Sequence, residues 1–340
     1  MLSQNARVRP DEQPCLVPSR CCATSRTADP TVTVKGKKYN GRQCYLQALL
    51  CDPDDGEAWA NLGDLLADDD VVDANGEHFT DRKCYIEALR CDPGDSYVWR
   101  QLGSAIERSD APGSVVTVNG KQYTDRQCLV QSVTCDLYSV DAWIDLGANL
   151  NSKRSETVEV AGKRYTKLLC FMEAVRCDPD NARAWVSLGN ATKTGETVSV
   201  SGVAYTPHQC YTQGLRCDAN RGDAWFGFGT TLPSGDKGSF DGKEYSARDC
   251  FLQAVSLDAN LGFAWTALSV IAAHGSFVVA GHTYTRQGCL LRAVHCDEFP
   301  GLAWHYLGQT LGNGEAIVVN GKFYTQQECC RKAVQHDKGK

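Results

Sequence analysis

The sequence predicts a mainly α-helical fold, an α–α superhelix or solenoid of about eight repeats, with a β-hairpin between the two helices of each repeat. Three observations support this prediction. A cysteine recurs at intervals of 39 to 44 residues, and every tryptophan follows the same period. Within each period, two apolar stripes with helical spacing flank a segment with hairpin signals. The recurring residues are Cys44, Cys84, Cys128, Cys170, Cys210, Cys250, Cys289 and Cys329, and the tryptophans, which we expect to be structural, are Trp59, Trp99, Trp143, Trp185, Trp225, Trp265 and Trp304.

The two helices of a repeat are clear in the stretch from 141 to 179. In the first, Trp143, Leu146 and Leu150 fall on one face of a short amphipathic helix. In the second, Cys170 begins another such stripe, which ends before Pro179 because the residue preceding a proline is disfavoured in helical geometry. The two stripes predict an antiparallel helix pair.

A β-hairpin is expected between these helices. Val158 and Val160 alternate with polar residues, as in a strand, and a glycine-containing turn follows. The turn dipeptides of other repeats favour positive φ angles and two-residue hairpin turns, and they are Asn75–Gly76, Asn119–Gly120, Asp241–Gly242 and Asn320–Gly321. After the hairpin, Thr124 with Gln127 predicts a capping box at the start of the second helix.

Two spacings predict how the hairpins are arranged. Paired strands lie about 4.8 Å apart, and packed helices lie about 8 to 10 Å apart. A hairpin is therefore about as wide as the step between helices. We expect consecutive hairpins to pair edge to edge in one continuous antiparallel sheet, which would hide strand edges that otherwise promote aggregation.

The stretch AWANLGDLL at 58–66, reached through CYLQALLCDPDDGE at 44–57, resembles the tetratricopeptide repeat. The residues that carry the resemblance are Tyr45, Ala48, Asp52, Pro53, Trp59, Leu62 and Gly63. The resemblance extends over residues 31–340 and implies a helical solenoid that binds proteins on its concave side. The family period is about 34 residues, so the predicted hairpin accounts for the extra length.

The predicted domain organisation is an N-terminal arm at 1–30 that contains proline, arginine and cysteine, followed by the solenoid at 31–340. The first repeat begins with its hairpin and second helix. No apolar run is long enough for a membrane helix, and the arm lacks the apolar core of a secretory signal. We expect an intracellular, cytoplasmic protein, with organelle targeting through the arginines of the arm as the alternative.

Composition and charge point to protein partners. The net charge is -6, and Lys and Arg are scattered through the chain. No basic stripe is present to neutralise a phosphate backbone, so nucleic acid is not an expected partner.

The chain is rich in cysteine, with 18 residues. Two cysteines recur seven positions apart in one helix, about 10 Å from each other, whereas a disulfide needs Cα atoms within about 7 Å. In the sixth copy Leu257 replaces the second cysteine, as expected if the position requires only a compact apolar group. Buried free thiols are therefore predicted, with disulfides between repeats and metal binding as the alternatives.

The sequence contains no recognisable catalytic motif. No glycine-rich phosphate loop or nucleophile elbow occurs, and no pair of carboxylates recurs. His208 and His295 stand near cysteines but lack the spacing of zinc ligands. We therefore expect no catalysis, cofactor or metal.

Two positions of the first helix change in chemistry from repeat to repeat, one directly after the tryptophan and one two residues before it. The resemblance to the tetratricopeptide repeat places both positions on the concave groove, and relaxed surface drift is the alternative explanation. The candidate protein-binding residues are Glu57, Tyr97, Arg100, Asp141, Ile144, Arg183, Val186, Asp223, Phe226, Phe263, Thr266, Leu302 and His305.

Function follows from these predictions. The favoured hypothesis is a non-catalytic scaffold or adaptor that binds a peptide or protein along the groove, with apolar character around Phe226 and Phe263. The alternative is a structural subunit that assembles head to tail into a filament or large complex, because the first repeat lacks a first helix.

Overall fold

The computed structural model divides the chain into two compact units, one up to Lys167 and one from Leu168 onward. The described residues are 31–34, 36–66, 70–74, 77–108, 114–151, 156–233, 235–272, 275–296, 300–312 and 314–338. The predicted arm at 1–30 and the turn at Asn75–Gly76 lie outside them. The single solenoid over 31–340 stays a prediction.

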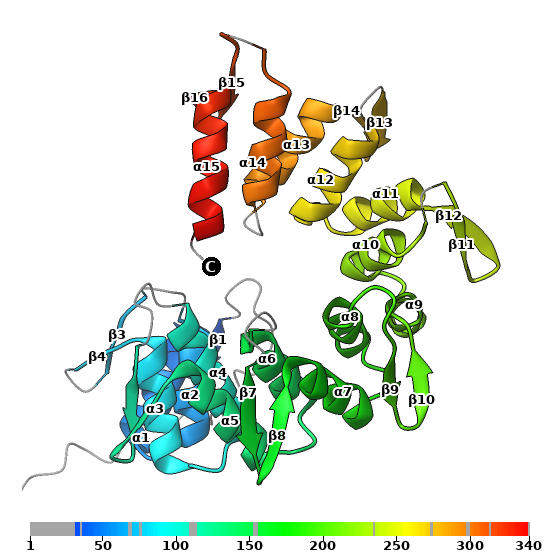
Figure 1. Ribbon diagram of the computed structural model, residues 1–340. Helices are drawn as coiled ribbons and strands as arrows, with labels where there is room; N and C mark the ends of the chain where they lie inside the picture. Colours follow the sequence, from blue (N-terminus) through cyan, green and yellow to red (C-terminus); the bar gives the residue numbers. More distant parts are fainter. Residues whose placement is uncertain are drawn as a thin grey trace, which may run out of the picture. The chain divides into compact units, whose positions relative to one another are not determined.

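Both units are built from helix pairs separated by short strands (Figure 1). The N-terminal unit contains β1 (Val32–Val34), β2 (Lys37–Tyr39), α1 (Gly41–Cys51), α2 (Gly56–Asp64), β3 (Val72–Ala74), β4 (Glu77–Phe79), α3 (Asp81–Cys91), α4 (Ser96–Glu107), β5 (Val116–Val118), β6 (Lys121–Tyr123), α5 (Asp125–Cys135), α6 (Val140–Asn149), β7 (Thr157–Val160) and β8 (Lys163–Thr166). From the unit boundary follow α7 (Lys167–Cys177), α8 (Ala182–Ala191), β9 (Val198–Val200), β10 (Val203–Tyr205), α9 (Pro207–Cys217), α10 (Gly222–Thr230), β11 (Lys237–Phe240), β12 (Lys243–Ser246), α11 (Ala247–Leu257), α12 (Gly262–Ile271), β13 (Ser276–Val279), β14 (His282–Thr285), α13 (Arg286–His295), α14 (Pro300–Gln309), β15 (Ala316–Val319), β16 (Lys322–Thr325) and α15 (Gln326–Lys338). The mainly α-helical class predicted from the sequence is confirmed.

The local signals at the start of the second helices are also confirmed. Thr124 caps α5, and its capping box with Gln127 satisfies two backbone groups that the helix itself leaves without partners. In the hairpin before it, Asn119 and Gly120 both have positive φ angles, 48° and 81°, as a tight two-residue turn requires. Hairpin and helix therefore form from adjacent short-range signals.

The prediction of a continuous sheet is wrong. Among the described strands, each hairpin pairs only within itself, which gives eight separate two-stranded sheets. The first strand of a hairpin contacts the second helix of the preceding repeat, as β5 contacts α3 and β13 contacts α11. These first strands therefore pack on helices of the preceding repeat, and the described hairpins do not pair with one another.

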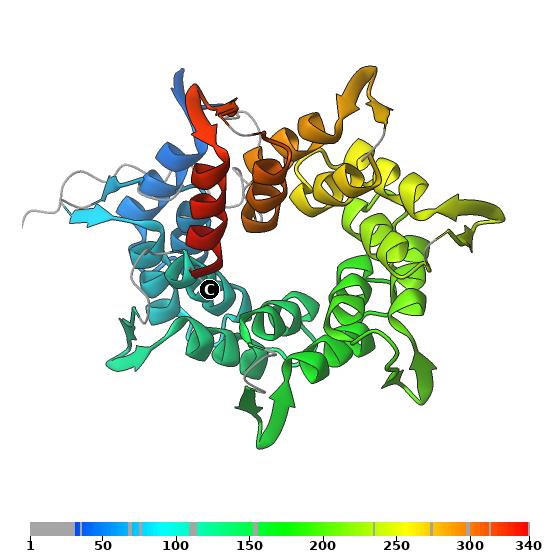
Figure 2. The same ribbon diagram turned by 45° about the horizontal axis from the view of Figure 1, so that its top comes forward.

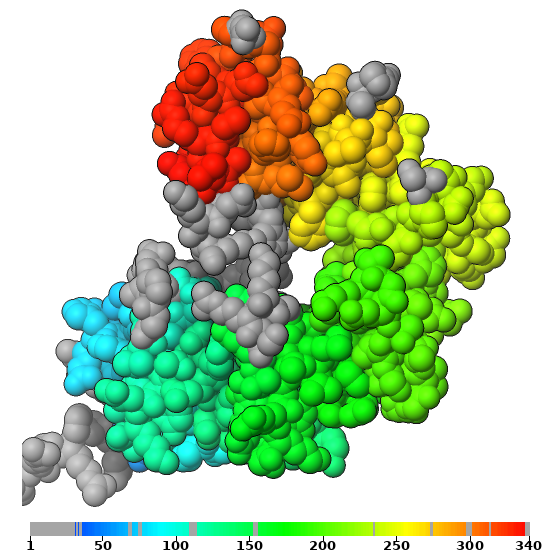
Figure 3. All heavy atoms as spheres, viewed as in Figure 1, coloured from blue at the N-terminus to red at the C-terminus, as the bar shows by residue number. Residues whose placement is uncertain are grey.

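Burial of apolar side chains explains this arrangement. The first strands turn alternate residues onto the helices, and the buried ones are Val118, Val160, Val198, Val200, Phe277, Val279, Ile317 and Val319. Burial removes these side chains from water, which favours packing on helices over pairing of edges. In the C-terminal unit the hairpins stand apart from one another (Figure 2), and the β11–β12 hairpin projects from the edge of that unit (Figure 3).

The tryptophans connect their helices to the preceding turn and to the following hairpin. Trp143 is buried, and its indole N–H donates to the carbonyl of Leu137, 2.8 Å away, in the turn before its helix. Its ring also lies 4.8 Å from the ring of Tyr165, which closes the following hairpin. The same donor bond is formed by Trp59, Trp99, Trp185, Trp225 and Trp265, at 2.7 to 2.9 Å. All seven tryptophans are buried.

The two recurring cysteines have different surroundings. The first cysteines, from Cys44 to Cys329, are free thiols that are at most 2% exposed. Burial raises the pKa of Cys250 to about 12, which keeps its thiol protonated at neutral pH.

The second cysteines are less buried, and several approach a carbonyl of the preceding repeat. Cys217 Sγ lies 3.6 Å from the carbonyl oxygen of Pro179, which also accepts the indole N–H of Trp185. Cys135 and Cys296 make the same contact at 3.9 and 3.8 Å. The prediction of buried thiols is wrong for two of these second cysteines, because Cys51 and Cys135 are exposed.

Two kinds of feature are absent from the described residues. No helix among them combines the length and the apolar character needed to cross a bilayer. They also contain no group of three or more His, Cys, Asp or Glu side chains that could hold a metal ion.

Replacing Trp143 with alanine should destabilise the N-terminal unit by roughly 3 to 5 kcal/mol, because the change removes a buried ring and its hydrogen bond. Denaturant unfolding measures this effect. Alanine at the exposed Tyr138 serves as the control and should leave stability nearly unchanged. A Trp143→Ala chain as stable as the parent would contradict the packing described above.

Candidate functional site

The first helices of successive repeats form the inner layer of each unit. Within the N-terminal unit α4 contacts α6, and within the C-terminal unit α8 contacts α10 and α12 contacts α14 (Figure 1). The second helices of successive repeats contact one another less, so each unit curves with its tryptophan-bearing helices on the inside. We call the exposed side of these helices the inner face.

The structure separates the candidate residues by burial. Of the residues two positions before a tryptophan, Glu57, Tyr97, Asp141 and Leu302 are exposed, and Arg183, Asp223 and Phe263 are partly exposed. Of the residues directly after a tryptophan, Arg100 and Phe226 are partly exposed, His305 is exposed, and Ile144, Val186 and Thr266 are buried. The three buried side chains serve packing, so a partner could contact only the remaining candidates.

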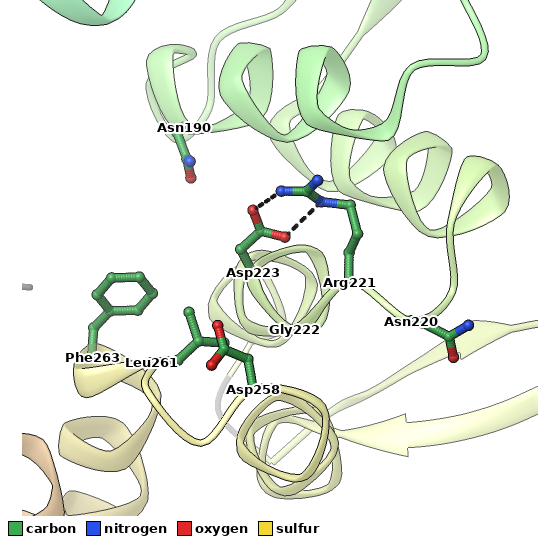
Figure 4. Close-up of a pocket in the computed structure, with 8 residues that line it drawn as sticks. All are labelled: Asn190, Asn220, Arg221, Gly222, Asp223, Asp258, Leu261 and Phe263. Atoms are coloured by element: carbon green, nitrogen blue, oxygen red, sulfur yellow. Dashed lines mark hydrogen bonds and ion pairs between the residues drawn. The ribbon is translucent and has the colours of Figure 1, made fainter. Parts of the chain in front are cut away.

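A pocket of about 550 Å³ lies on the inner side of the C-terminal unit (Figure 4). It brings together two candidate residues from neighbouring repeats, Asp223 at the start of α10 and Phe263 at the start of α12. Its other lining residues, which the sequence analysis did not single out, are Asn190, Asn220, Arg221, Gly222, Asp258 and Leu261. The pocket therefore draws on three successive repeats.

The charged groups of this pocket have hydrogen-bond partners within the unit. Arg221 donates two hydrogen bonds to Asp223, from Nε at 2.9 Å and from Nη2 at 2.5 Å (Figure 4). Hydrogen bonding to this carboxylate raises the pKa of Arg221. Asp258 accepts the backbone N–H of Asn260 in the turn before α12. These partners fix the polar side chains; the Arg221–Asp223 pair carries no net charge, whereas Asp258 keeps its negative charge.

The first residues of α10 and α12 differ from those of the other first helices. Arg221 and Leu261 occupy N-cap positions without a side-chain hydrogen bond to the helix. The equivalent residues of α2, α4, α6 and α8 all cap, and they are Asp55, Asp95, Ser139 and Asn181. Loss of a capping side chain typically lowers the stability of the helix or protein by about 0.5 to 2 kcal/mol. Two adjacent repeats thus lack this stabilisation where their residues line a pocket, a break in pattern that the sequence analysis missed.

An aromatic cluster lies beside the pocket. The ring centroids of Phe226 and Phe263 are 4.8 Å apart, and Phe226 lies 5.5 Å from the buried Phe251. Such spacings suit favourable aromatic packing. Phe226 and Phe263 therefore form one apolar wall, with Phe226 set deeper against the core.

The helix pairs resemble a repeat found in known proteins. Residues 44–83 match the model of the family described as tetratricopeptide repeat. The resemblance to this repeat is confirmed. No curated protein sequence matches the chain. The repeat supports a general role as a protein-interaction scaffold, because this helix pair commonly stacks into concave binding surfaces.

Similar solved structures include two of MamA and one of yeast Tom70. The first MamA match has 18% identity and a TM-score of 0.31, and it covers 44% of this chain and 74% of MamA. The second MamA match has 16% identity and a TM-score of 0.33, and it covers 53% of this chain and 82% of MamA. The Tom70 match has 12% identity and a TM-score of 0.45, and it covers 88% of this chain and 53% of Tom70.

In the N-terminal unit, the tetratricopeptide-like helices have a hydrogen-bonded polar cluster at the positions equivalent to the pocket. The carboxylate of Asp64 accepts hydrogen bonds from the hydroxyls of Tyr85 and Tyr97, at 2.9 and 2.5 Å. Arg100 pairs with Asp145 at 3.1 Å and stacks over the ring of Tyr97. The candidates Tyr97 and Arg100 therefore lie together, but their polar groups already bond within the unit.

A close helix contact positions the pocket residue Asn190. Tyr211 donates its hydroxyl hydrogen to Asn190 Oδ1 at 2.7 Å, and the tyrosine ring packs against Gly227 of α10. A Cβ atom added at Gly227 would lie 2.2 Å from Tyr211 Cε1, so the ring would have to move.

Replacing Gly227 with alanine should lower the free energy of unfolding by about 1 to 3 kcal/mol through overpacking. Denaturant unfolding tests this prediction. Alanine at Gly275 is the matched control, because a Cβ there meets no atom within 4 Å. Equal stability of the two variants would show that the helix contact is less tight than described.

Proposed function

We propose that the chain is a non-catalytic scaffold, in an intracellular setting, that binds a peptide or protein segment along the inner face. The tetratricopeptide repeat at 44–83 supports protein binding in general. The first cysteines are free thiols, which suits a reducing compartment. The scattered charge of the chain gives no support to nucleic acid as a partner.

The observation that carries the proposal is the pocket beside Phe263. The ring of Phe263 is partly exposed, and Phe226 and Leu261 extend the apolar surface around it. Interface energy commonly concentrates where an anchor side chain fills such a pocket. We infer that a partner inserts an apolar side chain beside Phe263, while Asn190 supplies a polar contact at the rim.

The polar side chains of the pocket already have hydrogen-bond partners, which supports binding rather than catalysis. Arg221 is paired with Asp223, Asn190 with Tyr211, and Asp258 with a backbone N–H. A general acid or base needs a side chain that can exchange a proton with a substrate. The polar side chains of the pocket instead stabilise the helix starts and turns that shape it.

Replacing Phe263 with serine should weaken partner binding by about tenfold or more, because the change removes the exposed aromatic contact. The partner is first captured from the source cells and identified, and its affinity is then measured with purified proteins. Phe226→Ser should weaken binding as well, with some loss of stability because Phe226 also packs on Phe251.

Val203→Ser is the matched control, since Val203 is exposed on a hairpin away from the inner face. Unchanged affinity of the Phe263→Ser chain for every captured partner would remove the pocket from the proposal. Loss of affinity with Val203→Ser would place binding on the hairpins instead.

Head-to-tail self-assembly is a second candidate, favoured by the open face of α15. Val334 of this helix is 51% exposed and Cys330 is exposed. In α13 the equivalent residues Leu290 and Val294 pack into the core beside α14. The last described helix therefore presents a face that another helix covers elsewhere in the chain.

If this face joins copies of the chain, sedimentation should show a mass that rises with concentration. Val334→Asp should then keep the chain monomeric, because burial of a carboxylate in an apolar contact is unfavourable. A parent chain that stays monomeric at every concentration would exclude the assembly.

A further inference from the structure

Each of the eight hairpins has one central cross-strand pair whose two residues are both exposed. These pairs occupy the same register position in every repeat. They are Thr33 with Lys38, Asp73 with His78, Thr117 with Gln122, Glu159 with Arg164, Ser199 with Ala204, Ser239 with Glu244, Val278 with Thr283 and Val318 with Phe323. The chain therefore offers eight versions of one solvent-facing site.

The chemistry of this site changes in the last two hairpins. The first six pairs contain no large apolar side chain. In the last two, Val278 is 66% exposed, Val318 is 49% exposed and Phe323 is 73% exposed. Exposed apolar residues on a short free hairpin favour unwanted pairing with other chains. Their presence at a site that is otherwise polar or small indicates a surface that a partner covers.

The β15–β16 hairpin also presents a free strand edge. In β15, Ile317 and Val319 are buried against the helices, whereas all four residues of β16 are exposed or partly exposed. Among the described strands β16 pairs only with β15. The backbone N–H and C=O groups on the outer edge of β16 are therefore available to another strand.

The small size of the apolar surface favours a short segment as the partner. On the β15–β16 hairpin, Val318 and Phe323 form a surface far smaller than the standard interface of about 1,600 Å². A stable dimer through this face would lack area. A short extended segment gains most of its affinity from main-chain hydrogen bonds and needs only a few side-chain contacts.

We propose that β16 is a docking edge for an extended segment of a partner protein, a site separate from the inner face. The segment adds a third strand to the hairpin and places alternate apolar side chains beside Phe323. Lys322 is exposed at the start of β16, so an acidic residue at the matching end of the segment adds charge complementarity.

In the test, displayed random peptides are selected for binding to the full chain. The affinity of the enriched peptides is then measured by fluorescence anisotropy. Enriched peptides that alternate apolar and polar residues should bind the Phe323→Lys chain about tenfold or more weakly. The matched control is Glu244→Lys, which makes the same position of the β11–β12 hairpin cationic and should leave affinity unchanged. Methylation of alternate peptide nitrogens on the pairing side should abolish binding.

Several results would overturn the proposal. One is equal affinity for the parent and the Phe323→Lys chain, and another is enrichment without peptides of alternating pattern. Peptides that lose affinity with Phe263→Ser, and not with Phe323→Lys, would assign binding to the inner face alone. A concentration-dependent dimer that Phe323→Lys dissolves would make a second copy of the chain the occupant.

Discussion

The rest of the structure depends on the buried indole of each first helix. In the N-terminal unit Trp143 bonds to the carbonyl of Leu137 and stacks on Tyr165 of the following hairpin. One side chain thereby fixes a turn, a helix and a hairpin relative to one another. Because this contact recurs with nearly constant geometry, the hairpin always leaves its repeat on the same side of the helix pair.

This constraint separates each unit into two working sides. The first helices lie close together on the inner side, and the hairpins lie beyond the second helices. The first strands of several hairpins contact a helix of the preceding repeat, and each described hairpin pairs only within itself. Side chains on either side can change without disturbing the indole contacts, and the residues equivalent to Phe263 and to Phe323 differ from repeat to repeat.

The pocket arises where local stability and ligand access compete. Arg221 and Leu261 stand where other repeats place a capping side chain, and both line the cavity beside Phe263. The ion pair between Arg221 and Asp223 offsets part of the lost capping by holding the start of α10. A surface that departs from the best local choice in adjacent repeats is typical of functional sites.

The sequence by itself determined the period, the helix pairs, the capping box at Thr124 and the turn at Asn119, because these features depend on residues only a few positions apart. Only the tertiary structure decided that first strands pack on helices of the preceding repeat and that the described hairpins form no continuous sheet. It also decided that Ile144 is buried while Phe263 lines a pocket, although both follow from the same repeating pattern. Such outcomes depend on distances between repeats, which no local spacing in the sequence specifies.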